Sequence, residues 1–562
     1  MTSAKNGARP ATLELTHRQI MTVLTGLMLG MLVAALSQTI VATALPTIVG
    51  DLGGQEQLSW VVSATLLAST ASTPLWGKLS DLYGRKITYQ AAIAIFLVSS
   101  LTTGFAQNMT ELIASRAVQG IGIGGLMALS QAIIGDVVSP RERGRYQGYL
   151  GSVFGIATIA GPLIGGFLVD HLSWRWTFWI SIPIGIAALV VTQRVLRLPF
   201  PRSRHAIDWL GAFFIVASVS SLLLVLSFGG KEFAWNSGWT YGLVATTLVT
   251  LALAVWQERR AVEPIMPPHL FANRTFALTS LAGLMVGVAM FGAIIFLPQY
   301  LQIVKGESPT ASGLLTLPLM AGLLGTSIAS GLVISRTGRY KIFPIAGMLI
   351  AAVGLALMSQ LSVHTPLPVA GVYMLITGCG IGLVMQVLVL AAQNAVEQKD
   401  LGVATSGATF FRSLGGAVGV AVFGALLTHR LLDTIPARLA EAGVGPGQLA
   451  GGQPTLGRPD QIASLPEPVH TAVITGFADA LQTTFIAGVP FAVLGFLVVL
   501  FLKQVPLRET AHVTQGERLA TAFETAVDPD ADLGFRGNGH RATSGATSES
   551  AGGVTQDRRS AI

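Results

Sequence analysis

Fourteen apolar stretches, each of 18 or more residues, constrain the fold of this chain more than any other feature of its sequence. A stretch of this length with few charges predicts a helix that crosses a lipid bilayer. Charged side chains make up only 11% of the 562 residues, against about 25% in soluble domains, so a soluble globule is excluded. The sequence therefore predicts an all-α polytopic membrane protein. The stretches lie near residues 20–48, 58–76, 87–107, 111–135, 147–169, 175–193, 208–229, 239–256, 276–301, 310–334, 342–361, 367–391, 403–428 and 480–502.

Lysine and arginine are unevenly divided between the two ends of these predicted spans. An even number of spans puts both termini on one side of the membrane. With the C-terminal tail left out, the loops on that side carry 20 basic residues and the loops on the other side carry six. Because basic loops stay on the cytoplasmic side, both termini are expected in the cytoplasm. The net charge of +7 is then explained by orientation in the membrane, and no nucleic-acid partner is expected.

A short motif occurs twice, which predicts two related halves. Residues 77–86 (GKLSDLYGRK) follow the second span, and residues 331–341 (GLVISRTGRYK) follow the tenth, with coinciding glycines at an offset of 254 residues. Such a duplication is typical of secondary transporters. The expected order is cytoplasmic tail 1–19, N-terminal six-helix bundle 20–195, inserted helices 196–257, cytoplasmic linker 258–275, C-terminal six-helix bundle 276–503 with a long outward loop 429–479, and disordered cytoplasmic tail 504–562.

Four motifs occur in order on the matching predicted helices. Residues 77–86 resemble the signature G-x-L-a-D-r-x-G-R-[KR] of the major facilitator superfamily, and residues 116–122 (RAVQGIG) resemble its helix-4 motif R-x-x-Q-G-x-G. Residues 263–276 are similar to the segment that leads into helix 9 of one subfamily. A further set of residues resembles the helix-5 antiporter motif: Gly151, Gly155, Gly161, Pro162, Gly165 and Gly166. Together these motifs resemble the fourteen-span drug:proton antiporters of the superfamily, the QacA/EmrB type.

The resemblance implies a major facilitator fold with 14 transmembrane helices, arranged as 6 + 2 + 6. It also implies a secondary active exporter that moves amphipathic small molecules, drugs among them, by proton-coupled alternating access. The expected location is the plasma (inner) membrane of a bacterium. The expected partners are small amphipathic substrates, protons and the lipid bilayer, and we expect a monomer without a cofactor.

The first loop motif is expected to act as a gate at the cytoplasmic face. Its small residues allow neighbouring helices to approach closely, and Asp81 can accept hydrogen bonds from Arg85 or from a helix N-terminus. Asp136, at the end of the fourth span, is a second candidate partner for Arg85. The helix-5 glycines and Pro162 are expected to provide close packing and a kink. The predicted gating residues are Gly77, Asp81, Gly84, Arg85, Lys86 and Asp136.

The first span departs from the family pattern at one position. Where the family usually carries an Asp in L-D-x-T-I-V, this chain has Ser37, so the usual carboxylate proton carrier is missing. Arg116 lies within the fourth span, where an unpaired guanidinium costs about 2.5–3.5 kcal/mol or more. Because a cation disfavours protonation of nearby groups, we expect Arg116 to couple proton binding to conformation.

Polar side chains inside the spans are the candidates for a substrate cavity, since such groups face a bundle interior or an aqueous cavity. No Asp or Glu falls well inside a span, so the cavity is expected to accept neutral or anionic amphiphiles. Trp60 is expected to be an interfacial anchor or a ligand contact. The candidates are Gln38, Trp60, Gln119, Gln299, Tyr300, Gln386 and Arg412.

Other classes of function find little support in the sequence. The predicted spans hold no His/Asp/Glu or Cys constellation for catalysis or metal binding, so no enzyme is expected. Residues 120–125 match G-x-G-x-x-G without the preceding strand that a dinucleotide site requires, and no G-x-x-x-x-G-K-[ST] occurs. Cys379 is the one cysteine and cannot form an internal disulfide. Two alternatives stay open: an exporter of a specific endogenous metabolite or lipid, and a membrane sensor that does not transport.

Overall fold

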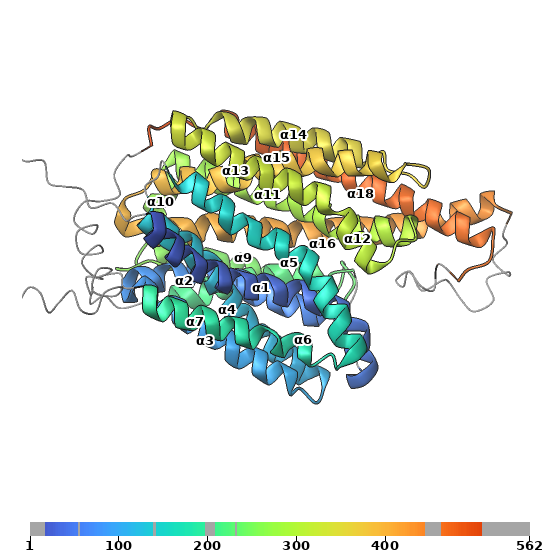
Figure 1. Ribbon diagram of the computed structural model, residues 1–562, viewed down its shortest axis with the longest axis horizontal. Helices are drawn as coiled ribbons and strands as arrows, with labels where there is room; N and C mark the ends of the chain where they lie inside the picture. Colours follow the sequence, from blue (N-terminus) through green and yellow to red (C-terminus); the bar gives the residue numbers. More distant parts are fainter. Residues whose placement is uncertain are drawn as a thin grey trace, which may run out of the picture.

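The computed structural model describes residues 17–53, 57–138, 142–196, 208–230, 233–443, 462 and 464–507. Helices build this part of the chain and form two bundles that lie side by side (Figure 1). Most of the predicted N-terminal tail 1–19 and nearly all of the predicted C-terminal tail 504–562 lie outside the described residues.

The N-terminal half forms one bundle with its own apolar core. Leu24, Phe96 and Leu129, from three of its helices, belong to one buried cluster. The helices are α1 (His17–Leu52), α2 (Leu58–Tyr83), α3 (Arg85–Gly104), α4 (Met109–Val137), α5 (Arg143–His171), the short α6 (Trp176–Trp179) and α7 (Ser181–Val195).

The C-terminal half forms the second bundle. Its largest buried cluster includes Leu297, Leu355 and Phe485. The elements are α10 (Pro268–Ala272), α11 (Arg274–Gln299), the π-helix η2 (Tyr300–Val304), α12 (Pro309–Leu315), α13 (Leu317–Thr337), α14 (Ile342–Met358), α15 (Leu367–Asn394), the 3₁₀ turn η3 (Gln398–Asp400), α16 (Leu401–Glu441) and α18 (Val469–Leu500).

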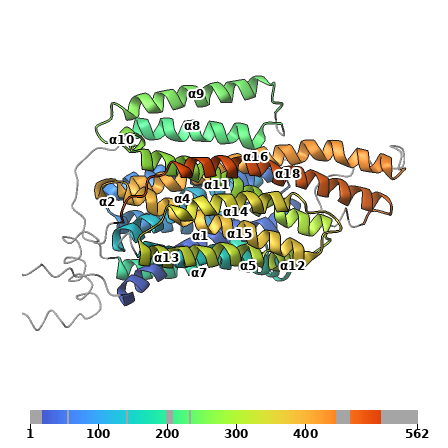
Figure 2. The same ribbon diagram turned by 90° about the horizontal axis from the view of Figure 1, so that it is seen from above.

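Between the halves the chain forms a hairpin of two helices, α8 (Trp209–Phe228) and α9 (Gly238–Glu258). Figure 2 shows this hairpin beside the two bundles, with α9 on the outside. α8 packs against α2 and α16, and α9 packs against α8. Both helices fall in the region 196–257 for which the sequence predicts an inserted pair, and that this pair is an insertion between two six-helix bundles stays a prediction.

Eleven helical segments of the described residues are long and apolar enough to cross a membrane. The remaining long helices, α2, α5 and α14, coincide with predicted spans but are not among these eleven. α2 is rich in Ser and Thr, which lower its mean hydropathy, and α14 has only 17 residues. The chain is thus a multi-pass, all-helical membrane protein, and the count of fourteen spans stays a prediction.

The predicted outward loop 429–479 is helical at both of its ends. α16 continues to Glu441, and α18 begins at Val469. The apolar residues Leu427, Leu431 and Ile435 recur every four positions and belong to the same buried cluster as residues of α18, so these helix ends pack against each other as an antiparallel pair. The pair projects beyond the bundles (Figure 2).

The two bundles meet mainly through two pairs of helices, α2 with α16 and α5 with α13. We call the end of the bundles at which α2 meets α3 the motif end; it is the end where α10 lies in Figure 1. The excess of lysine and arginine in the loops at this end predicts that the motif end faces the cytoplasm.

Candidate functional site

An ion-pair cluster lies at the motif end. The guanidinium of Arg85 pairs with Asp81 (Nη1–Oδ1 2.6 Å) and with Asp136 (Nε–Oδ2 2.6 Å). Arg85 is buried and also donates to the Ser80 hydroxyl. One cation therefore joins the end of α2, the start of α3 and the end of α4, and both partners named from the sequence contact it.

The same cluster reaches the opposite bundle. Oδ2 of Asp81 accepts a hydrogen bond from the backbone N–H of Val403 (3.0 Å), in the first turn of α16. A helix N-terminus carries unpaired N–H groups and a partial positive charge, so a carboxylate is stabilised there. Asp81 thus links the salt bridge of the N-terminal bundle to the N-terminus of a C-terminal helix.

Close packing between α2 and α16 depends on glycines at the points where the helices touch. A Cβ atom on Gly77 would overlap the Ser406 hydroxyl and lie 2.9 Å from the carbonyl oxygen of Gly402. A Cβ atom on Gly402 would overlap Asp81 and Arg85. The glycine of the motif therefore makes room for the contact that Asp81 completes.

Gly84 and Lys86, the remaining two residues predicted to act in gating, lie at the start of α3 or directly before it. Gly84 separates α2 from α3 with φ +94°, a value that L side chains rarely adopt. Lys86 is half-buried, and its ammonium donates to the backbone carbonyl of Gln193 in α7 (2.8 Å).

The motif end holds further contacts between the bundles that sequence reasoning missed. Arg143, at the start of α5, donates to Oε1 of Gln393 in α15 (3.2 Å), and Nε2 of Gln393 donates to the backbone carbonyl of Gln131 in α4 (3.2 Å). Lys78 pairs with Glu263 of the segment between α9 and α10. In the sequence Arg143 was one more basic residue of a cytoplasmic loop, and nothing local marked Gln393 as its partner.

If the chain is a transporter, as the resemblance implies, we expect the substitution Gly77→Val to slow transport, because the added side chain separates α2 from α16. Overpacking of this kind costs about 1–3 kcal/mol, which corresponds to about a 5- to 150-fold change in the equilibrium between closed and open motif end. The measurement is the initial rate of export in liposomes. Gly242→Val is the matched control, since a Cβ atom on Gly242 of α9 meets nothing within 4 Å. A wild-type rate in the Gly77 variant would contradict a role for this contact.

Arg116 lies buried in α4, with 2% of its surface exposed. Its Nη1 donates to Oε1 of Gln119 (2.6 Å) and to the hydroxyl of Ser37 (3.3 Å), and its Nε donates to the backbone carbonyl of Val61 (3.4 Å). Nε2 of Gln119 donates in turn to Ser100 in α3 (2.7 Å). Within the described part of the chain, no carboxylate forms an ion pair with Arg116. Ser37, at the position where the family usually has an Asp, is one of its direct neighbours.

The helix-5 glycines face two different helices. Cβ atoms on Gly151 and Gly155 would contact Leu324 of α13, which belongs to the opposite bundle, whereas a Cβ atom on Gly161 would overlap Thr39 of α1. Gly165 is buried, and a Cβ atom on Gly166 would meet nothing within 4 Å. α5 runs through position 162 as one helix, and the side chain of Pro162 is not among those described. These glycines therefore serve packing both within a bundle and between bundles.

Two of the predicted cavity residues have structural partners. Tyr300 is fully buried in the apolar core, and its hydroxyl donates to the backbone carbonyl of Ser362 (3.0 Å). Trp60 stacks on Phe228 of α8, with ring centroids 3.9 Å apart. Both side chains hold helices together, so the contacts around them favour a packing role over ligand contact. Of the remaining candidates, Gln38 is exposed and Gln299 is half-buried.

Two predicted cavity residues each have a buried polar atom with no hydrogen-bond partner among the described residues. These atoms are Oε1 of Gln386 in α15 and Nη1 of Arg412 in α16, and Oε1 of Gln131 in α4 is in the same situation. A buried polar group without a hydrogen bond costs about 1–3 kcal/mol. Such atoms can therefore bind the polar part of a ligand or a water molecule. No group of three or more His, Cys, Asp or Glu side chains within the described ranges could hold a metal ion.

Comparison with known proteins decides the family. Residues 27–420 match the family described as Major Facilitator Superfamily. The chain belongs to this superfamily. Among curated relatives, it is 38% identical to the multidrug transporter protein MdtP of Bacillus subtilis over 525 residues, which cover 90% of this chain and 97% of the relative. It is 32% identical to multidrug resistance protein 3 of the same species (88% and 97% covered) and 43% identical to an uncharacterised MFS-type transporter of Mycobacterium tuberculosis (87% and 70% covered).

Solved structures of the superfamily share the fold. The proton:xylose symporter XylE superposes with a TM-score of 0.57 at 14% identity, over 90% of this chain and all of that one. The human organic anion transporter MFSD10 superposes with a TM-score of 0.55 at 16% identity, over 85% of this chain and 99% of that one. At these identities the likeness supports the fold alone. The family and the transporter relatives make this chain a membrane transporter and not an enzyme.

Proposed function

We propose that this transporter exports amphipathic small molecules, drugs among them, across a bacterial plasma membrane by alternating access, driven by proton influx. The motif end faces the cytoplasm in this proposal, and both termini lie there. Multidrug efflux is supported by the relatives named as multidrug transporters, which match nearly the whole chain.

The observation that carries the proposal is the link from Arg85 through Asp81 to the N-terminus of α16. It fastens the two bundles together at one end, next to Gly77 and the hydrogen bond between Arg143 and Gln393. Alternating access requires contacts that can break as the bundles rock against each other. In the proposed cycle this arrangement is the state closed to the cytoplasm.

The chemistry of the buried polar atoms favours amphipathic substrates that are not dications. Gln386 and Arg412 offer an amide oxygen and a guanidinium nitrogen that have no hydrogen-bond partner in the part of the chain that the structure describes. Asp81 and Asp136 lie near helix ends, and Asp433 and Asp479 lie in the parts of α16 and α18 outside the predicted spans 403–428 and 480–502. The proposed cavity therefore binds the apolar body of a substrate by burial and accepts neutral or anionic polar groups.

Proton coupling is the least usual part of the proposal, because Ser37 replaces the expected acid beside Arg116. A membrane potential supplies about 2.3 kcal/mol per charge per 100 mV, so the entry of one proton at 100 mV can sustain about a 50-fold gradient of a neutral substrate. In the proposal, the positive charge of Arg116 lowers the proton affinity of the groups near it, and this effect changes with conformation.

The test uses purified protein in liposomes under an imposed pH gradient, with cationic, neutral and anionic fluorescent dyes. We expect neutral and anionic dyes to move in a gradient-dependent manner, and a protonophore to abolish this movement. Movement that ignores the gradient would overturn proton coupling but keep transport. Failure to move any dye would instead favour a specific endogenous metabolite or lipid as the substrate, and ligand binding without flux would favour a sensor.

A further inference from the structure

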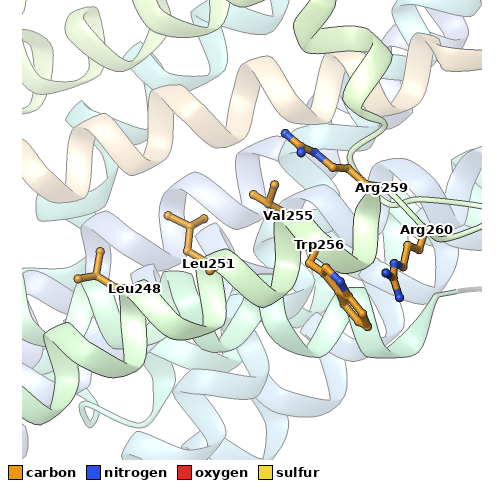
Figure 3. A pocket seen from close by; sticks show the side chains of 7 residues that line it. Leu248, Leu251, Val255, Trp256, Arg259 and Arg260 are labelled. Atoms are coloured by element: carbon orange, nitrogen blue, oxygen red, sulfur yellow. The ribbon is translucent and has the colours of Figure 1, made fainter.

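The outer face of α9 carries a groove of about 520 Å³ that the proposed transport cycle does not use. Figure 3 shows Leu248, Leu251 and Val255 in a row along this helix, with Arg259 at the end of the row. All four side chains are exposed. Because α9 packs against α8 on its other side and is a candidate membrane span, this face would lie against lipid.

Two arginines close the groove at the motif end. Arg259 and Arg260 directly follow α9, and both are exposed. The guanidinium of Arg260 lies over the ring of Trp256, 4.3 Å from its centroid. Within the described part of the chain, neither arginine forms an ion pair with a carboxylate. Their positive charges are therefore available to an anion outside the protein.

The acidic side chains close by in sequence or space bind other groups. Glu258 is buried and accepts hydrogen bonds from the backbone N–H groups of Ile265 (3.2 Å) and Met266 (3.0 Å). Asp208 accepts from the backbone of the first turn of α8 and from Gln257 (3.0 Å). Glu263 pairs with Lys78. None of these contacts neutralises the two arginines.

The dimensions of the groove fit one leaflet of a bilayer. From Leu248 to Arg259 the helix rises about 16 Å at 1.5 Å per residue, close to half of the hydrocarbon thickness of about 30 Å. Trp256 lies one turn before the basic end, at the depth where aromatic side chains gather in membrane proteins. An apolar row of one leaflet's length that ends in a tryptophan and two arginines matches the shape and charge of a phospholipid with an anionic headgroup.

We propose that the outer face of α9 is a binding site for an anionic phospholipid. An acyl chain lies along Leu248, Leu251 and Val255, and the phosphate is held by Arg259 and Arg260. The site lies where the segment that leads to α10 begins, and the same segment is tied to the gate by the pair of Glu263 and Lys78. A bound lipid would therefore hold the hairpin close to the contact between Asp81 and α16, which breaks in the proposed cycle.

The test measures lipid binding to the full-length purified protein in detergent by native mass spectrometry, independently of transport. The protein is titrated with dioleoyl phosphatidylglycerol and with dioleoyl phosphatidylcholine. Each basic residue near an anionic surface contributes about a factor of five in affinity, so we expect the variant R259Q/R260Q to bind phosphatidylglycerol about 25-fold more weakly. Its binding of phosphatidylcholine should not change. The variant R259K/R260K should keep most of the preference, since it retains both charges.

The control is R18Q/R194Q, which removes two exposed arginines from α1 and α7. It should bind phosphatidylglycerol as the wild type does. Inorganic phosphate should not compete, because it lacks the acyl chain. An equal loss in R18Q/R194Q would overturn the site in favour of diffuse surface charge. Unchanged binding in R259Q/R260Q, or an equal loss of both lipids, would also overturn it.

Discussion

Replacing Arg116 with glutamine is expected to abolish gradient-driven export while the protein still inserts and folds. The guanidinium contacts Ser37 of α1 and Gln119 of α4, and it also reaches the backbone of Val61 in α2. Hydrogen bonds from a charged group contribute about 1.5–3 kcal/mol each, so the loss of one such bond alone changes a rate about 10- to 150-fold. Insertion should survive because no ion-paired carboxylate is left behind in the bundle, which is the usual reason that such substitutions unfold a protein.

The measurement for Arg116 is the initial rate of dye export in liposomes at a fixed pH gradient, scaled to the amount of inserted protein. Arg116→Lys keeps the charge and is expected to retain part of the rate. Arg175→Gln is the control, because Arg175 is an arginine of the same bundle that is partly exposed and pairs with Asp51. In Ser37→Asp a carboxylate stands beside the guanidinium, and we expect the pH dependence of export to change. An unaltered rate in Arg116→Gln would remove Arg116 from the mechanism.

The parts of the ion-pair cluster that are close in sequence could be predicted. Asp81 and Arg85 are four residues apart across one helix junction, and Asp136 ends the next helix but one, so charge and spacing bring them together. The contacts across the bundles could not be predicted in this way. Val403 contributes only a backbone N–H group more than 300 residues away, and a backbone donor has no signature in its side chain. Arg143 has a long-range partner of the same kind.

The fold, too, has parts that the local sequence predicts and parts that depend on packing between distant segments. Long apolar stretches predict membrane helices from composition alone, and these predictions coincide with helices of the structure. The frequent glycine, proline and alanine residues of segment 429–479 predict a loop. Its ends are helical because Leu431 and Ile435 bury one face of α16 against α18, and this stabilisation comes from packing that no single helix reveals. Tyr300 and Trp60 illustrate the same point, since their partners on other elements decide between packing and ligand contact.

Arg85→Gln is expected to open the motif end of the transporter. The substitution leaves Asp81 and Asp136 close together without their shared cation, in a site where the carboxylates are only 11% and 16% exposed. Removing one partner of a buried ion pair costs about 3–5 kcal/mol. Even at the lower value the balance between closed and open states shifts by about a hundredfold. The cost falls on the closed state, because the two carboxylates, which both belong to the N-terminal bundle, are buried against α16 there and become hydrated when the bundles part.

Distances between spin labels would report this opening. Labels are placed on cysteines at two exposed positions: Tyr83, the last residue of α2, and Lys399, in η3 directly before α16. Cys379→Ser removes the native thiol. In Arg85→Gln a population with a longer distance should appear and dominate. Arg175→Gln is the control, because it removes an arginine that pairs with Asp51 at the opposite end of the bundle, and it should leave the distances as they are. If the distance distribution of Arg85→Gln matched that of the wild type, the ion-pair cluster would be a static structural element and the gate would have to lie elsewhere.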